Sequence, residues 1–328
     1  MNAPAPAEAR ETAVPAAART PMVSVIMPVY NGARTLRAAI DSVLAQTFQD
    51  FEFIVVDDAS TDDSAAIVRS YGDRIRFVRR PTNSGKCAVP RTEALQISSG
   101  RYWAFIDQDD GWQPRKLEMQ THFMETHPEF AMSHTYAWLI DGDGENRGVR
   151  HQGLIPPSGP CARELLAHCF ITTSTLMMRR RGFTPDDDVH LLPQIANSDY
   201  LFFFRELQIS PAGIGFIPEP LASYRQWPGS MSHGRWKWSP EDVPALLNLR
   251  KSRLWRGLVS PRDMRQAIAH ACLLNAQHHA DQGRFGRTCY FALHGWPRAP
   301  MEFRFGSALL KSVLKSELRT IRLILKRS

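Results

Sequence analysis

Residues 23–32 read VSVIMPVYNG, and residues 51–63 read FEFIVVDDASTDD. In both segments a run of β-branched and other apolar residues ends at a cluster of polar residues, which is typical of a buried strand followed by a loop. Similar runs occur at Ile75–Val78 and Tyr102–Ile106. The segments that separate or follow the four runs have the length of helices, and they are Thr35–Gln46, Asp62–Tyr71, Ala88–Ser98 and Pro114–His127. This alternation predicts an α/β fold with a mostly parallel sheet covered by helices on both faces.

The rest of the chain has a less regular pattern. Segments after residue 130 mix strand and helix signals, and their order in the sheet does not follow from the sequence. Residues 241–328 have a helical pattern with breaks near Pro261, at Gly283–Gly286 and at Pro297–Pro300. At 328 residues the chain exceeds the usual size of one hydrophobic core. We therefore expect three parts, which are an Ala- and Pro-rich leader without fixed structure at 1–21, an α/β domain at 22–238 and a helical region at 239–328.

Composition excludes several classes of protein. Hydrophobic residues make up 43% and charged residues 22%, as in soluble globular proteins. The five cysteines include no CxxC pair, so neither a zinc site nor a disulfide framework is indicated. The sequence has no apolar stretch of membrane-spanning length and no signal-peptide pattern at its start. These features predict a protein of a reducing, cytoplasmic compartment.

The positive charge is concentrated at the C-terminus. Residues 298–328 hold eight Lys or Arg and only two Glu, so they account for most of the formal net charge of +7. Apolar residues recur there at helical spacing, each followed by a cation, at Leu310–Lys311, Leu314–Lys315, Leu318–Arg319, Ile321–Arg322 and Leu325–Lys326. This stripe predicts an amphipathic helix that either contacts an anionic membrane at the inner face or packs on its own domain. Charge confined to the tail does not favour a nucleic-acid partner.

Polar residues follow the predicted strands at their carboxyl ends, where open α/β sheets bind ligands. Asp107, Asp109 and Asp110 come directly after Tyr102–Ile106. Three carboxylates in one turn repel one another unless a cation lies between them, and carboxylate oxygens suit Mg²⁺ or Mn²⁺. The alternative is an acidic turn that caps the helix predicted from Pro114.

Other polar segments allow two interpretations each. The pair Asp57–Asp58 can accept hydrogen bonds from a ribose or a base, or it can serve the following turn. The turn Asn83–Lys86, followed by Arg91, offers cations and a helix start to a pyrophosphate, or it is an ordinary turn. Asp199 heads an amphipathic segment, where it can be simply an N-cap.

Taken together, the motifs resemble those of family 2 glycosyltransferases. The resemblance rests on VSVIMPVYNG at 23–32, SVLAQTF at 42–48, IVVDDASTD at 54–62 and DQDDGWQPRKL at 107–117. It covers residues 22 to 128 densely, with later matches at Ser198–Tyr200 and at Glu219–Arg225.

The resemblance implies a GT-A fold and transfer of a sugar, with inversion, from a nucleotide diphosphate donor to an acceptor hydroxyl. A UDP-sugar is the expected donor, and a saccharide or lipid-linked molecule is the expected acceptor. Cell-surface polysaccharide or lipopolysaccharide synthesis is the expected process.

The resemblance also implies roles for individual residues. Pro28 and Tyr30 flank the nucleobase, and Asp58 contacts base or ribose. Asp107 and Asp109 hold ribose and metal, and Asp199 corresponds to the general base. To the donor site we add the cations Lys86 and Arg91, and to the metal site His233.

The sequence departs from the family pattern at three places. Ser198 replaces a usual Glu, Pro90–Thr92 stands where an Ala-Arg-Asn run is common, and Arg235–Trp236 preserves only the end of a QxxRW motif. The third departure, and the absence of membrane spans, argue against a processive synthase.

Two other functions remain open at this point. A nucleotidyltransferase would have a Gly-rich, basic loop near its first strand, where this chain has Pro28–Gly32. A degenerate transferase that serves as a binding scaffold would keep the sheet and lose the base. Donor hydrolysis and its metal dependence distinguish the three functions.

Overall fold

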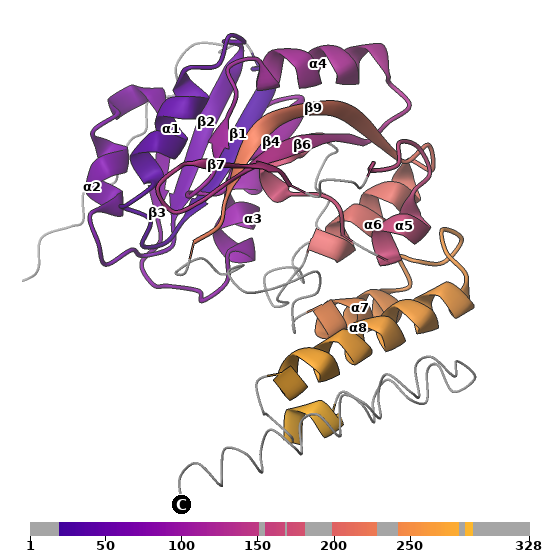
Figure 1. The fold of residues 1–328 in the computed structure, drawn as a ribbon. Helices are drawn as coiled ribbons and strands as arrows, with labels where there is room; N and C mark the ends of the chain where they lie inside the picture. Colours follow the sequence, from indigo (N-terminus) through magenta and orange to yellow (C-terminus); the bar gives the residue numbers. More distant parts are fainter. Residues whose placement is uncertain are drawn as a thin grey trace, which may run out of the picture.

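The predicted alternation of strands and helices is confirmed in the first part of the chain. The computed structural model describes residues 20–150, 155–167, 169–180, 199–227, 242–281 and 286–290. The first four strands are β1 (Val23–Val29), β2 (Phe51–Asp57), β3 (Arg76–Arg79) and β4 (Tyr102–Phe105). They pair in parallel in the order β3-β2-β1-β4. Figure 1 shows these strands side by side.

Helices cover both faces of this parallel sheet. They are α1 (Leu36–Leu44), α2 (Ser64–Arg69), α3 (Ala88–Ile97) and α4 (Lys116–Thr126), with a short 3₁₀ helix η1 (Gly72–Arg74) before β3. All seven residues of β1 are buried. Val25 and Met27 pack in one hydrophobic cluster with residues of α1, whereas Ile26 packs in a second cluster with residues of α3. Successive residues of a strand point to opposite faces, so a continuously apolar strand is what a two-sided sheet requires.

The second part of the sheet mixes directions. It contains β5 (Gly111–Trp112), β6 (Met132–Ile140), β7 (Asn146–Val149), β8 (Met177–Arg179) and β9 (Ile214–Arg225), with a 3₁₀ helix η2 (Thr173–Thr175) before β8. The complete order is β3-β2-β1-β4-β8-β6-β9-β5, and β7 pairs with β6. β8 is antiparallel to both β4 and β6, and β9 runs parallel to β6. In Figure 1 the long β9 curls across the sheet toward β1.

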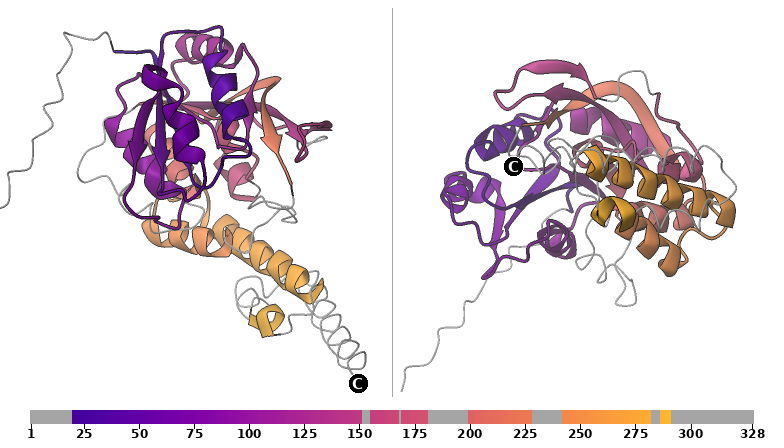
Figure 2. Two further views of the ribbon diagram at one scale, coloured as in Figure 1. Left: turned by 90° about the vertical axis from the view of Figure 1, so that its left-hand side faces the viewer. Right: turned by 60° about the horizontal axis from the view of Figure 1, so that its bottom comes forward.

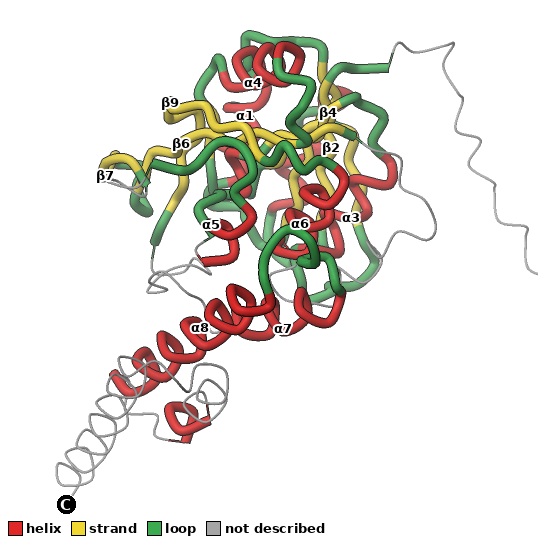
Figure 3. Tube along the Cα trace, turned by 90° about the vertical axis from the view of Figure 1, so that its right-hand side faces the viewer, coloured by secondary structure: helices red, strands yellow, loops and turns green. Residues whose placement is uncertain are grey.

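The helices of the later part pack on the α3 face. They are α5 (Ala162–Ala167), α6 (Asp199–Ile209), α7 (Asp242–Ser252) and α8 (Pro261–Asp281). Leu246 of α7 and Ile268 of α8 belong to the same buried cluster as Phe204 of α6 and Trp103 of β4. Figures 2 and 3 show α7 and α8 as an adjoining pair, from which α8 extends away from the sheet. A helical C-terminal part is therefore present.

Several predictions concern residues outside the described part of the chain. These are nearly all of the leader 1–21, the boundary at 238 and 239, and the amphipathic tail. The division into three parts stays a prediction. Among the described helices, none combines the length and the hydrophobicity that crossing a bilayer requires.

Candidate functional site

The turns after β1, β2 and β4 meet at the carboxyl ends of the parallel strands. The backbone N–H of Asn31 donates to Ser60 Oγ at 2.9 Å, and that of Thr61 donates to Asn31 Oδ1 at 2.8 Å. The side chain of Gln108 accepts from the Tyr30 N–H at 2.7 Å and donates to the Tyr30 carbonyl at 2.9 Å. Three turns distant in sequence thus form one rim, as the sequence predicts.

Gly32 lies close to the side chain of Gln108 within this rim. A Cβ atom at Gly32 would lie 2.6 Å from the amide group of Gln108. The ring of Tyr30 remains 42% exposed, so it lies at the surface of the rim. Pro28, by contrast, is a buried residue of β1 opposite Val56 of β2. The strand extends two residues further than predicted, because Pro28 and Val29 continue its pairing.

Asp57 serves the turn that follows β2. Its side chain is buried, accepts a hydrogen bond from the Ser60 N–H at 3.1 Å, and lies 3.2 Å from Arg79 Nε. The Ser60 hydroxyl also donates to it. Of the two interpretations of the acidic pair, the structure therefore favours the turn for its first member.

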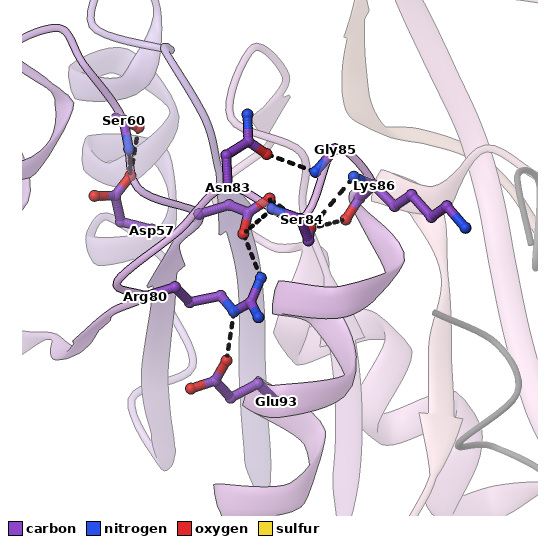
Figure 4. A network of polar contacts seen from close by, with 9 residues as sticks. Asp57, Ser60, Arg80, Asn83, Ser84, Gly85, Lys86 and Glu93 are labelled. Atoms are coloured by element: carbon purple, nitrogen blue, oxygen red, sulfur yellow. Dashed lines mark hydrogen bonds and ion pairs between the residues drawn. The ribbon is translucent and has the colours of Figure 1, made fainter. Parts of the chain in front are cut away.

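Asp58 holds the loop that precedes α3, where Figure 4 labels its partners Arg80 and Ser84. Arg80 Nη1 donates to Asp58 Oδ1 at 2.6 Å, and the Ser84 hydroxyl donates to Oδ2 at 2.6 Å. The Ser84 N–H lies 3.1 Å and 3.0 Å from the two oxygens. Arg80 also pairs with Glu93 of α3 at 3.1 Å. The side chain of Asp58 is 4% exposed, so this carboxylate faces the loop in the structure.

Of the two cations assigned to the donor, Lys86 precedes α3 and Arg91 lies in the first turn of this helix. Lys86 is exposed in the loop before the helix, and its carbonyl accepts from the Ser84 hydroxyl at 3.0 Å. Arg91 Nη2 donates to Asp107 Oδ1 at 3.2 Å. The structure therefore brings Arg91 to the acidic turn after β4. No role is tested by this geometry, and both assignments stay predictions.

Asp109 and Asp110 differ in their surroundings. Burial, and next the charge of Asp107, raise the pKa of Asp109 to about 6, while the Trp227 indole N–H acts in the opposite direction. Burial raises the pKa of Asp110 well above its ordinary value. Asp110 is 3% exposed, and it accepts from the Ser174 hydroxyl and from the Arg225 N–H. Asp110 is thus an internal anchor, whereas Asp107 and Asp109 are partly exposed.

The acidic turn does not cap α4. The N-cap position of that helix is Arg115, and no side chain makes a capping hydrogen bond there. The alternative to a ligand site is therefore not supported for Asp107 and Asp109. Two neighbouring carboxylates, one of them with a raised pKa, fit a divalent cation, because a cation would offset their repulsion.

A cation here would take few ligands from the protein. Within the residues that the structure describes, no group of three or more His, Cys, Asp or Glu side chains is arranged to hold a metal ion. Mg²⁺ is commonly bound by one or two carboxylates together with substrate phosphates and water. The carboxylate pair fits that chemistry.

Two predicted residues cannot be placed fully. Asp199 is the first residue of α6, but its side chain lies outside the described part of the structure, as does the whole of His233. Their roles remain predictions.

Sequence reasoning did not assign a role to two residues at the end of β9 and just beyond. Arg225 Nε donates to the Asp109 carbonyl at 2.9 Å, and its Nη1 donates to the Asp141 carbonyl at 3.0 Å. The indole of Trp227 interacts with Asp109, and the Arg34 guanidinium lies 4.9 Å from its ring centroid. The match at Glu219–Arg225 included Arg225 but gave no contact partner.

A buried lysine, Lys116, contacts the tryptophan that follows the acidic turn. Lys116 Nζ is 4.2 Å from the centroid of the Trp112 ring and donates to Gln120 Oε1 at 2.5 Å. Burial lowers its pKa well below the ordinary value. Trp112 in turn donates to the Ser174 carbonyl at 2.8 Å. Trp112 and Ser174 therefore connect the turn after β4 to the buried Lys116, because Ser174 also donates to Asp110.

Comparisons with known proteins agree with this architecture. A 21% identical structure, S. aureus TarS residues 1–349 in complex with UDP-GlcNAc, superposes with a TM-score of 0.58 over 88% of this chain and 79% of that one. At this identity the likeness concerns the fold, which is the GT-A fold expected from the sequence.

In sequence comparisons, the chain matches relatives over most of the relatives' length. The chain is 34% identical to the Escherichia coli UDP-Glc:alpha-D-GlcNAc-diphosphoundecaprenol beta-1,3-glucosyltransferase WfaP, over 66% of this chain and 82% of that protein. It is 33% identical to the Bacillus subtilis putative teichuronic acid biosynthesis glycosyltransferase TuaG, over 66% of this chain and 84% of that protein. Residues 24–185 match the model of glycosyl transferase family 2. The chain therefore belongs to glycosyl transferase family 2 and is an inverting glycosyltransferase.

Proposed function

We propose that this enzyme transfers a hexose from a UDP-sugar to a hydroxyl of a saccharide carried on a lipid diphosphate. The relative WfaP, which is named for such a donor and such an acceptor, supports both halves of the proposal. The observation that carries the chemistry is the position of a partly buried Asp109 beside Asp107 at the rim of the sheet. A nucleotidyltransferase is not favoured by the family match.

We assign Asp107 and Asp109 as the residues that hold Mg²⁺ or Mn²⁺, with His233 as a further candidate. Such an ion supplies Lewis-acid stabilisation of the charge that develops on the leaving diphosphate. Arg91, held by Asp107, and exposed Lys86 bring positive charge to the same donor. Their contribution is electrostatic, and it is largest in a site that excludes water.

Tyr30 and Asp58 are assigned to the nucleoside. The exposed ring of Tyr30 offers a flat apolar surface to a base. Asp58 holds the loop beside this nucleoside site through Arg80 and Ser84. We propose that Asp58 reaches the base when the loop 83–86 releases one oxygen of the Asp58 carboxylate. The buried Pro28 shapes the end of β1 beneath that site.

Asp199 is assigned as the general base. Inversion requires the acceptor hydroxyl to attack the anomeric carbon from the face opposite the diphosphate while it loses its proton. A carboxylate at the start of α6, separate from the acidic turn after β4, is suited to take that proton.

For the location, we propose a cytoplasmic enzyme bound peripherally at the inner face of the membrane. A lipid-linked acceptor is found there, and the basic tail at 298–328 complements anionic headgroups. We assign no nucleic-acid partner.

A donor panel tests the function. Nucleotide sugars differing in base and sugar are incubated with and without Mn²⁺, and release of nucleoside diphosphate is measured. We expect Mn²⁺-dependent turnover of a UDP-hexose that rises when a saccharide diphosphate-lipid is added. Failure to turn over or bind any nucleotide sugar would leave the scaffold function as the better account.

A further inference from the structure

The turn between α7 and α8 carries a dense group of exposed cations. Between residues 250 and 265 the chain has six Lys or Arg and one carboxylate, Asp263. We define the basic turn by its six cations, all of them exposed, which are Arg250, Lys251, Arg253, Arg256, Arg262 and Arg265. We propose that the basic turn docks the enzyme on an anionic lipid bilayer.

The single carboxylate in this segment is committed elsewhere. Asp263 accepts from the Ser260 hydroxyl at 2.7 Å and from the Ser260 N–H at 3.1 Å, which caps the start of α8. It also lies 3.1 Å from Arg163 of α5. Within the described residues, none of the six cations of the basic turn lies within ion-pair distance of an acidic group. Their charge is therefore available to an external anion.

Favourable interaction with a helix dipole explains the positions of only some of the six cations. Arg250 and Lys251 occupy the last turn of α7, where cations interact favourably with the helix dipole. Arg262 is the second residue of α8, at the end where the dipole disfavours a cation. The stability of the fold gives no reason for a cation at that position, whereas a negatively charged partner does.

The backbone holds the turn in a fixed shape. Gln208 of α6 donates to the carbonyls of Leu254 at 2.7 Å and Arg256 at 2.6 Å. Arg253 and Gly257 adopt left-handed conformations, with φ of 67° and 80°. The cations are thus presented by an ordered turn, which lowers the entropic cost of binding.

The apolar residues of the turn point inward. Leu254, Trp255, Leu258 and Val259 pack against the main hydrophobic cluster. The Trp255 indole N–H donates to the Arg250 carbonyl at 3.0 Å. An electrostatic contact without deep insertion of side chains is therefore expected.

This arrangement fits a bilayer better than a nucleic acid. The turn between α7 and α8 lies at the right-hand end of α8 in Figure 1, and its six cations are exposed, which suits a broad anionic surface. Single-stranded nucleic acids are usually bound in grooves with aromatic rings for stacking, and the one aromatic ring of this turn packs inward. Arg163 of α5 forms an ion pair with Asp263 at the start of α8.

Vesicle sedimentation tests the proposal. The full-length triple variant Arg253→Gln, Arg256→Gln, Arg262→Gln is compared with the wild type on phosphatidylglycerol–phosphatidylcholine vesicles at low salt. Each cation near an anionic surface contributes about 1 kcal/mol, so we expect a partition coefficient about a hundredfold lower. Because the basic tail is present in every protein, the difference reports on the turn.

A matched control removes the same charge elsewhere. Arg37, Arg69 and Arg74 are exposed on α1, α2 and η1, and α2 lies across the molecule from the basic turn in Figure 1. The variant with these three changed to Gln should sediment nearly as the wild type does. Equal losses in both triple variants, or no loss in the first, would overturn the proposal.

Two further measurements separate the remaining explanations. Wild-type protein should not sediment with pure phosphatidylcholine, and a filter-binding assay with polyuridylate should show no binding that depends on the turn. Turn-dependent RNA binding as tight as vesicle binding would identify nucleic acid, and not the bilayer, as the partner of the turn.

The proposal relies on the proposed function only for the presence of a membrane-borne acceptor. Vesicle binding is measured without donor or acceptor, so its result stands whether or not UDP-hexose is the substrate.

Discussion

The backbone N–H of Arg225 donates to Asp110 Oδ1 at 2.9 Å, although the two residues are 115 positions apart. The same arginine donates through Nε to the Asp109 carbonyl at 2.9 Å. Ser174 donates to the second oxygen of Asp110. The acidic turn is therefore fixed from β9 and from η2, and Asp109 is held in a partly buried position beside Asp107. This fixed arrangement carries an electrostatic cost.

Asp109→Asn should abolish metal-dependent transfer and yet stabilise the metal-free protein at pH 7 to 8. The folded-state pKa of Asp109 is raised to about 6 from 3.8. Between these values the folded state binds more protons than the unfolded state, so stability falls as pH rises toward 6. Above pH 6 the ionised carboxylate destabilises the fold by an amount on the order of 3 kcal/mol, which Asn removes. Thermal unfolding without metal checks this.

Added Mn²⁺ gives the control for that variant. The ion should raise the melting temperature of the wild type, because ligands that bind only the folded state stabilise it. It should leave Asp109→Asn nearly unchanged. Equal Mn²⁺ affinities for the two proteins would contradict the assignment of Asp109.

Trp227→Phe should weaken Mn²⁺ binding more at pH 6 than at pH 8. Phenylalanine keeps an aromatic ring near Arg34 but loses the indole N–H, which lowers the pKa of Asp109. Protons then compete better with the metal at pH 6, and we expect an affinity about tenfold lower there. Electron paramagnetic resonance of free Mn²⁺ measures it. A loss of affinity that is the same at both pH values would indicate a purely structural effect.

The parallel half of the fold was predictable because each strand is buried on both faces. The continuous apolar run of β1 identifies it as a strand, and the polar residues after it identify the rim. The end of β1 was predicted too early, since a proline such as Pro28 usually suggests a loop. The later half was not predictable, because β6 and β9 pair across some eighty residues with register shifts near Tyr136.

The candidate site shows the same division. The acidic turn and Tyr30 follow from local motifs, whereas the contacts of Asp58 with Arg80 and Ser84 depend on the folded loop. The main contact of Arg225 with Asp110 uses the backbone N–H. Every residue except proline has this group, so no side-chain pattern reveals such a contact.

Asp58→Asn should raise the KM for the donor and lower stability by about 1 to 3 kcal/mol. Arg80 and the Ser84 hydroxyl donate to different oxygens of Asp58, and an amide places an NH2 donor at one of these two positions, so one of the hydrogen bonds is lost. Urea unfolding and donor kinetics check the two effects.

Ser84→Ala separates these effects. It removes one hydrogen bond from Asp58 but leaves the carboxylate and its Arg80 contact. If Asp58 reaches the base when an oxygen is released, this variant should bind donor at least as tightly as the wild type. A donor KM raised as much as in Asp58→Asn would show that the closed loop itself is required.

Lys116→Met should remove a pH dependence of stability. Burial lowers the folded-state pKa of Lys116 well below 10.5, so the unfolded state binds more protons over the interval between the two values. Wild-type stability therefore rises with pH up to about 10.5. The variant lacks this contribution, so its stability should exceed that of the wild type by more at pH 6 than at pH 9.5. Urea unfolding at the two pH values measures this difference in stability.

The control is Lys86→Met, at an exposed site, which should change stability by less than about 0.5 kcal/mol at either pH.

Asp199→Asn should leave donor and metal affinity near those of the wild type while it slows sugar transfer by about a hundredfold or more. The assigned contact of Asp199 is with the acceptor hydroxyl, so an isosteric neutral side chain changes the chemical step and spares the nucleotide pocket. An N-cap at the start of α6 would behave differently, because Asn caps helices about as well as Asp. In that case neither the melting temperature nor the rate would change much. Single-turnover transfer and donor binding, measured on the same preparation, distinguish the two roles. If the variant transfers sugar at the wild-type rate, the base lies elsewhere, and Asp186–Asp188 is the segment to change next.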